Sequence, residues 1–201
     1  MLRLDHLAIS ALRLEDGVAT VEALLGVPMA GGGQHAAMGT HNRLLGLGDL
    51  YLEVIAIDPE ASPPGRARWF DLDHFTGPPR LTNWVVACDD IDAARADGPP
   101  GWGTPMQLSR GDYRWQMAVP DDGRLPFDNA CPALIRWQGA MHPAPVLPDH
   151  GLRLARLTVS HPQAAALRAA LGLDDPRLDF VIGPVGLSAV IDTPKGAVTL
   201  P

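Results

Sequence analysis

The sequence predicts an α+β fold made of repeated βαβββ modules. Three observations predict it: the apolar runs are short, 21 Gly and 20 Pro separate them, and the same order of elements returns along the 201 residues. The three openings, residues 4–10, 81–87 and 154–160, follow one another at a spacing of roughly 75 residues. Internal duplication of one module accounts for this pattern better than coincidence.

The first module is predicted over residues 1–58, and it opens with an apolar strand. Apolar residues at helical spacing, acids in the first turn and a glycine past the last turn then indicate a helix over residues 15–25. A glycine-rich connection is expected at residues 31–33. Two β-compatible runs with almost nothing between them predict a hairpin of residues 42–48 and 50–57.

A proline-rich connection is predicted over residues 59–80, with a short helix or turn at residues 67–73. The second module, residues 81–140, repeats the order of strand, helix and three strands. The third module, residues 152–201, is shorter, and its helix is bounded by proline and glycine. Because no sheet remains to cover the third module, we expect it to pack against a second chain in a homodimer.

Composition excludes several classes of protein. With 16 Lys and Arg against 23 Asp and Glu, the net charge of −7 argues against nucleic acid as a partner. Cys88 and Cys131 form no CxxC pair, which excludes a zinc ribbon or a disulfide framework and favours two buried hydrophobes. No apolar run approaches the roughly 18 residues of a membrane span, so we expect no membrane partner and a cytoplasmic protein.

Two polar residues on predicted strands are candidates for chemistry. Strand alternation puts His6 on one face with Leu4 and Ala8, while Glu53 is the lone acid in the apolar run 50–57. A carboxylate in such surroundings has to be paired, hydrogen-bonded or protonated. Glu53 is therefore either a site residue, part of a structural ion pair or an edge-strand acid in water. A histidine such as His6, taken alone, is more commonly structural, and only the combination with Glu53 favours a site.

In combination these residues resemble the vicinal oxygen chelate superfamily, specifically its glyoxalase-like domains. The resemblance is carried by the histidine in Leu4-Asp5-His6-Leu7, the glutamate in Tyr51-Leu52-Glu53-Val54 and the repeated modules. It implies mixed sheets of two modules curled around a cleft. There, histidines or glutamines of opening strands and glutamates of closing strands hold a divalent metal that polarises vicinal oxygens of the substrate. Other members bind drugs in a metal-free cleft.

Carried over residue by residue, the resemblance matches His6 and Glu53 to the two metal-ligand positions of the first module. His41 is a candidate third ligand, with a solvent-exposed turn residue as the alternative. The expected cofactor is one divalent ion (Zn, Fe, Mn or Ni) or none. In the second module Asn83 stands where histidine or glutamine is expected, and the closing strand 132–137 has no acid.

Arg136 is the polar residue of that closing strand expected to face the cleft, unless its register turns Ile135 and Trp137 inward. A guanidinium repels a divalent ion but receives a carboxylate through paired hydrogen bonds. Alternatively, Arg136 closes a structural salt bridge with Glu53. Trp137 is a candidate wall of an aromatic ligand pocket.

The sequence therefore predicts an enzyme of the lyase or isomerase type that acts on a small, oxygenated, anionic metabolite. Its expected catalytic residues are Glu53 and His6, and its expected substrate-binding residues are Arg136, Asn83, His41 and Trp137. The alternative is a metal-free protein that binds or sequesters a small molecule.

Overall fold

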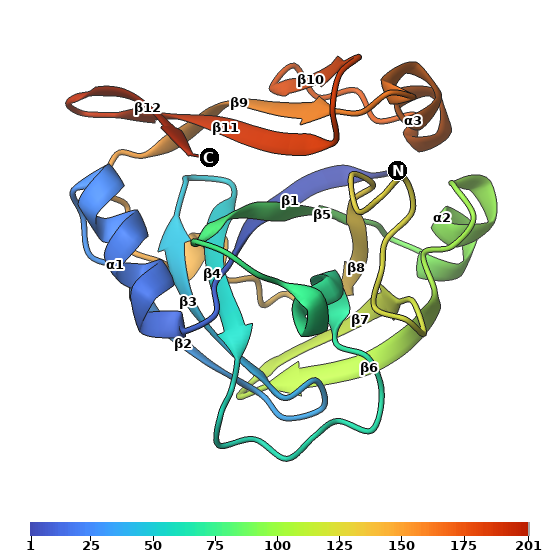
Figure 1. Cartoon of the computed structure of the whole chain (residues 1–201), viewed down its shortest axis with the longest axis horizontal. Coiled ribbons are helices and arrows are strands. Elements are labelled where there is room, and N and C mark those ends of the chain that lie inside the picture. Colours follow the sequence, from blue (N-terminus) through green and yellow to red (C-terminus); the bar gives the residue numbers. More distant parts are fainter. Residues whose placement is uncertain (201) are drawn as a thin grey trace.

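The computed structural model describes residues 1–200, and its elements fall into three βαβββ groups (Figure 1). The first group comprises β1 (Arg3–Ser10), α1 (Leu14–Leu25), β2 (Ala30–His35), β3 (Thr40–Gly46) and β4 (Tyr51–Ile57). The second comprises β5 (Arg80–Ala87), α2 (Ile91–Asp97), β6 (Thr104–Arg110), β7 (Tyr113–Val119) and β8 (Ala133–Trp137), preceded by the 3₁₀ helix η1 (Trp69–His74). The third comprises β9 (Arg153–Ser160), α3 (Ala164–Leu171), β10 (Leu178–Val181), β11 (Gly186–Thr193) and β12 (Gly196–Leu200), after the 3₁₀ turn η2 (Ala144–Val146).

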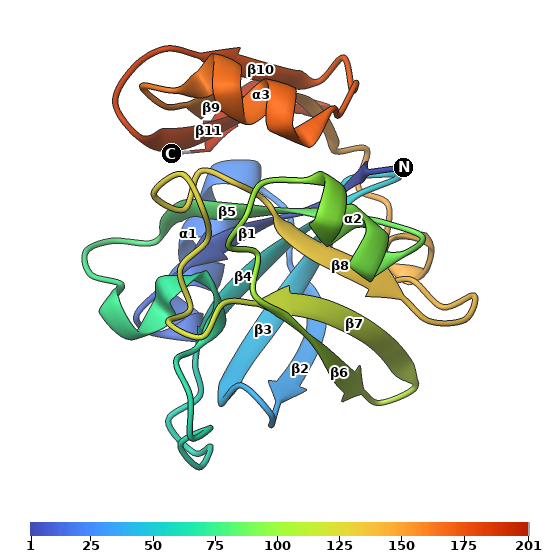
Figure 2. The same cartoon turned by 90° about the vertical axis from the view of Figure 1, so that its right-hand side faces the viewer.

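The first two groups share one eight-stranded mixed sheet in the order β2-β3-β4-β1-β5-β8-β7-β6. Its centre is the antiparallel pair β1 and β5, the opening strands of the two groups. The sheet curls so that its two outer strands, β2 and β6, lie side by side (Figure 2). A Cβ on Gly33 in β2 would lie 2.7 Å from Cδ of Arg110 in β6, so the two edges meet where glycine leaves room for the arginine. The fold predicted from repeated modules is confirmed.

The glycine run is the part of this sheet that the sequence analysis misassigned. Residues 31–33 do not connect two elements; they lie within the edge strand β2, which pairs antiparallel with β3. Glycine is required there because a Cβ on Gly32 would lie 1.9 Å from the carbonyl oxygen of Asn42. Close approach of another backbone outweighs the low strand preference of glycine.

The third group forms a separate four-stranded sheet, β10-β9-β11-β12, which lies as a layer over the eight-stranded sheet (Figure 1). Phe180 of β10 contacts the ring of Trp84 of β5, and Leu157 and Ile191 belong to the same hydrophobic core as Leu7. The expectation that this sheet lacks a partner within the chain is therefore wrong. The homodimer that was inferred from it stays a prediction, which light scattering tests.

Across residues 1–200, none of the helices combines the length and apolar character needed to cross a bilayer.

Candidate functional site

A cavity lies inside the curled sheet and encloses about 380 Å³ of space free of protein atoms, part of it open to solvent. Its polar lining consists of His6, His35, Asn42, Tyr51, Glu53 and Arg110. Its remaining lining consists of Trp69, Phe70, Trp115, Met117, Ile135 and Trp137. A few polar groups in a largely aromatic hollow are typical of a small-molecule site.

His6 and Glu53 meet in this cavity because of the pairing of their strands. β1 and β4 are parallel, and His6 lies opposite Tyr51 while Ala8 lies opposite Glu53, so the alternation brings both side chains to the concave face. Nε2 of His6 lies 3.6 Å from Oε2 of Glu53, which is an ion pair and too long for a hydrogen bond. The ring of Tyr51 stacks on His6 at 4.3 Å. The predicted convergence of imidazole and carboxylate is observed, whereas their roles stay proposals.

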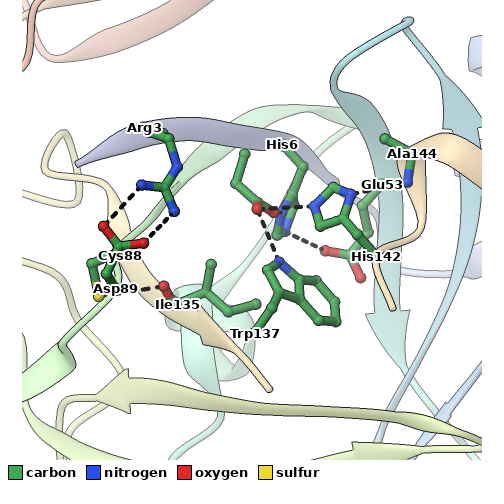
Figure 3. Close-up of polar contacts among 10 residues, drawn as sticks. Arg3, His6, Glu53, Cys88, Asp89, Ile135, Trp137, His142 and Ala144 are labelled. Carbon is green, nitrogen blue, oxygen red and sulfur yellow. Dashed lines mark hydrogen bonds and ion pairs between the residues drawn. The ribbon is translucent and has the colours of Figure 1, made fainter. Parts of the chain in front are cut away.

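Asp5 also reaches His6, although strict alternation would turn it to the opposite face. The pairing of β1 with β5 shifts register between Leu4 and His6, which is a β-bulge that re-aims the Asp5 side chain. Oδ1 of Asp5 lies 2.5 Å from Nδ1 of His6, and its Oδ2 accepts a hydrogen bond from Nε1 of Trp137 at 2.9 Å. Nε2 of His142 lies 3.1 Å from the same Oδ2. Figure 3 shows His6, Glu53, Trp137 and His142 converging in this network.

The two carboxylates decide the charge of the buried ring between them. Burial alone lowers the pKa of His6, but Asp5 and Glu53 outweigh it and raise the pKa to about 9. Burial alone raises the pKa of Glu53, yet the protonated His6 ring holds it at about 2. Asp5 behaves in the same way, its pKa lowered by His142 and His6 against the effect of burial. At neutral pH the site therefore contains an imidazolium between two carboxylates.

His35 differs from His6 because no carboxylate among residues 1–200 forms a hydrogen bond or ion pair with it. Burial lowers the pKa of His35 to about 4, so its ring is neutral at neutral pH. Its Nδ1 lies 3.3 Å from the Thr40 hydroxyl, and its edge meets the rings of Trp69 and Trp115. His35 is therefore an uncharged part of the cavity wall.

Asn42 and Arg110 complete the polar side of the cavity. Nδ2 of Asn42 donates to Oε1 of Glu53 at 2.5 Å, and Nη1 of Arg110 donates to Oδ1 of Asn42 at 2.8 Å. Nη2 of Arg110 donates to no group within residues 1–200. A cationic side chain with an unused donor thus stands at the edge of a site that already contains two carboxylates.

Only one of the four predicted substrate-binding residues lines this cavity. Trp137 does, together with Ile135, so the register of β8 turns Arg136 to the other face. There Nε of Arg136 donates to the carbonyl oxygen of Asp89, and its Nη1 donates to Gln116. The expectation that Arg136 faces the cleft is therefore wrong, and so is the alternative of a salt bridge with Glu53, whereas the alternative register, with Ile135 and Trp137 turned inward, is the one observed.

His41 and Asn83 also lie outside the cavity. His41 lies opposite Ala56 on the face of β3 that points away from Asn42 and Glu53. Asn83 faces the concave side as expected, opposite Ala8, but it lines a neighbouring hollow with Phe70 between the two. Neither residue is in position to act with His6.

The donors in the cavity do not fit a resident divalent ion. Within residues 1–200, no group of three or more His, Cys, Asp and Glu side chains is arranged to hold a metal. His6, His35 and Glu53 line the cavity without being grouped to hold an ion, and the Arg110 guanidinium beside Asn42 adds a positive charge nearby. His41, the expected third ligand, faces away from the cavity.

Comparison with known families identifies the protein class. The model of the glyoxalase-like domain matches residues 4–173. The chain belongs to this family. The resemblance seen in the sequence is confirmed. The match spans the two groups that form the eight-stranded sheet, together with β9 and α3 of the third group.

The solved structures that resemble this glyoxalase-like protein are distant from it in sequence. A hypothetical protein from Staphylococcus aureus is 14% identical, with a TM-score of 0.63 over 92% of this chain and 88% of that chain. A hypothetical protein from Bacillus halodurans is 14% identical, with a TM-score of 0.49 over 70% and 96%. Methylmalonyl-CoA epimerase from Streptomyces coelicolor is 17% identical, with a TM-score of 0.45 over 69% and 98%. No curated protein matches the chain.

Several residues of the site were missed by the sequence analysis. Asn42 could have been predicted, because the hairpin that contains Glu53 places alternate residues of both strands on one face. Arg110 lies within the predicted second module, yet nothing in the sequence shows that β6 closes onto β2. Asp5 depends on a bulge, and His142 comes from a connection; neither carries a sequence signal.

Proposed function

We propose that the protein is an acid–base enzyme of the lyase or isomerase type that acts on a small anionic carbonyl compound. The observation that carries the proposal is the buried pair of Glu53, ionised, and His6, protonated, in a cavity edged by Arg110. Paired titratable groups whose pKa values are pushed apart are typical of acid and base assignments. The carboxylate of the substrate would bind Arg110.

In the proposed reaction the carbonyl oxygen accepts a hydrogen bond from Nε2 of His6, and Glu53 removes a proton from the adjacent carbon. The C–H bond breaks, its electron pair forms the C=C bond of an enol, and the C=O pair moves to oxygen, which takes the proton of His6. As His6 loses its charge, the effect that holds the pKa of Glu53 low disappears, so Glu53 becomes a stronger base. Return of a proton to a different position or face completes an isomerisation, and loss of a leaving group completes an elimination.

Asp5 has a supporting part in this proposal. It bonds Nδ1 of His6, so that Nε2 is the nitrogen left to face the substrate. The hydrogen bonds from Trp137 and His142 in turn fix the Asp5 carboxylate.

Proton exchange at the carbon next to a carbonyl tests the proposal without knowledge of the natural substrate. We expect the protein to accelerate exchange of deuterium from D₂O into a panel of 2-oxo acids, followed by proton NMR. Glu53→Gln should lower the rate roughly 100-fold or more. Glu60→Gln, a change at an exposed glutamate, is the matched control and should leave it unchanged.

Two outcomes favour other functions. Saturable binding of a 2-oxo acid with no acceleration of exchange would favour the sequestration protein. Exchange that EDTA abolishes and a divalent ion restores would favour a metal centre on His6 and Glu53 that the substrate completes.

A further inference from the structure

The indole of Trp69 presents a buried donor that the protein leaves unused. Trp69 lines the cavity and is 4% exposed, and its Nε1 has no acceptor among residues 1–200. The indoles of Trp84, Trp102 and Trp137 all donate to protein oxygens. A buried indole N–H ordinarily finds a partner, so the unpaired donor of Trp69 at the cavity indicates that a ligand oxygen supplies it.

The backbone that holds Trp69 is strained at the cavity. Phe70 and Asp71 in η1 have φ of 60° and 52°, in the left-handed region that bulky residues rarely adopt. The amide of Asp71 donates to the carbonyl oxygen of Gly123 at 3.0 Å, which fixes this turn. Strain of this kind gathers at ligand sites, and here it directs Trp69 and Phe70 from a connection to the cavity.

Aromatic rings from four elements continue the wall that Trp69 begins. Trp69 of η1 meets His35 of β2 edge-on at 5.1 Å, and His35 meets Trp115 of β7 at 5.9 Å. Trp115 lies 5.6 Å from Trp137 of β8. Such tilted and perpendicular arrangements are the ones in which an inserted ring is held by edge-to-face contacts.

We propose that the substrate is a small aromatic carboxylate whose ring contacts Trp115 and Trp137 and whose oxygens accept hydrogen bonds from Arg110 and Trp69. This inference rests on the proposed function, since it names the substrate class of the same site. Trp69 then recognises the substrate by donating its indole N–H to a substrate oxygen.

Binding of phenylacetate and of cyclohexylacetate tests the inference, because the two acids differ only in aromaticity. We expect phenylacetate to bind the wild-type protein roughly 3- to 10-fold more tightly, as measured by ligand-observed NMR titration. Trp69→Phe keeps a ring but removes the N–H, so it should weaken both acids by roughly 5-fold and retain the preference. Trp115→Leu should abolish the preference. Arg110→Gln should weaken both acids, whereas the exposed control Arg114→Gln should change neither.

Equal or tighter binding of cyclohexylacetate would overturn the inference, and so would unchanged binding by Trp69→Phe when circular dichroism shows the variant folded. These titrations need no turnover. Failure of the substrate class would therefore leave the Glu53-dependent proton exchange intact, while failure of the proposed function would show as exchange that Glu53→Gln does not lower.

Discussion

Asp5, His6 and Glu53 form a buried group whose charges depend on one another. The His6 ring is 4% exposed and retains its proton only because a carboxylate faces each side of it. Burial favours the neutral ring, and the two carboxylates favour the protonated ring. If either carboxylate is removed, only one negative charge remains to oppose the effect of burial. The residue that sets the state of the proposed catalytic pair is therefore Asp5, which lies outside the cavity lining.

We predict that Asp5→Asn lowers the pKa of His6 from about 9 toward or below its ordinary value of 6.5. In the wild-type protein the raised pKa contributes stability that is fully present below pH 6.5 and is lost as the pH rises through about 9. In the variant, the free energy of unfolding should therefore fall less between pH 6.5 and pH 9 than it does in the wild-type protein. NMR titration of the His6 ring and urea unfolding at pH 6, 7.5 and 9 measure the two effects.

His35 reports on the same change from across the cavity. Burial lowers its pKa to about 4, and the charge of His6 contributes to that lowering. Asp5→Asn should therefore leave the pKa of His35 unchanged or raise it, in the direction opposite to the change at His6. A His6 pKa that stays near 9 in the variant would show that Glu53 alone holds the proton.

At the scale of elements, α1 is positioned by a glycine in its interior. Gly17 is buried against β4, and a Cβ at this position would lie 2.5 Å from Cγ1 of Val54 and 2.8 Å from Cβ of Ala11. Glycine costs about 1 kcal/mol of helix propensity relative to alanine. Close packing of α1 on β4, the strand that bears Glu53, offsets that cost.

We predict that Gly17→Ala destabilises the protein by about 1–3 kcal/mol despite its better helix propensity, because the new methyl group overlaps both neighbours. The exposed match Ala19→Gly should cost about 1 kcal/mol through propensity alone. Urea unfolding measures both variants. In a Val54→Ala background the penalty of Gly17→Ala should shrink; a penalty that stays the same would show that Val54 is not the obstacle.

For the whole molecule, the third group shares one hydrophobic core with the first two. Leu157 and Val159 of β9 are fully buried in the same core as Leu7 and Trp84. The four-stranded sheet thus covers the outer side of β1 and β5, whose inner side faces the cavity. We expect this cover to keep the strand of His6 rigid.

We predict that Leu157→Ala, which leaves a cavity far from the site, lowers the stability of the whole chain by about 2–5 kcal/mol. Hydrogen exchange followed by mass spectrometry should then speed up equally in β9 and in β1. Ile182→Ser, at a position 80% exposed, should change neither. Faster exchange confined to residues 153–200 would contradict a single cooperative unit.

The sequence by itself determined the modules and the hairpin of β3 and β4, because periodicity and strand alternation are local properties of the chain. The convergence of His6 with Glu53 was implied by the family resemblance, and the parallel pairing of β1 with β4 produces it. Tertiary structure alone decided that Asp5 joins His6, because a bulge breaks the alternation. It also decided that Arg110 rather than Arg136 supplies the cation, because strand register and the closure of β2 onto β6 depend on contacts between residues far apart in the chain.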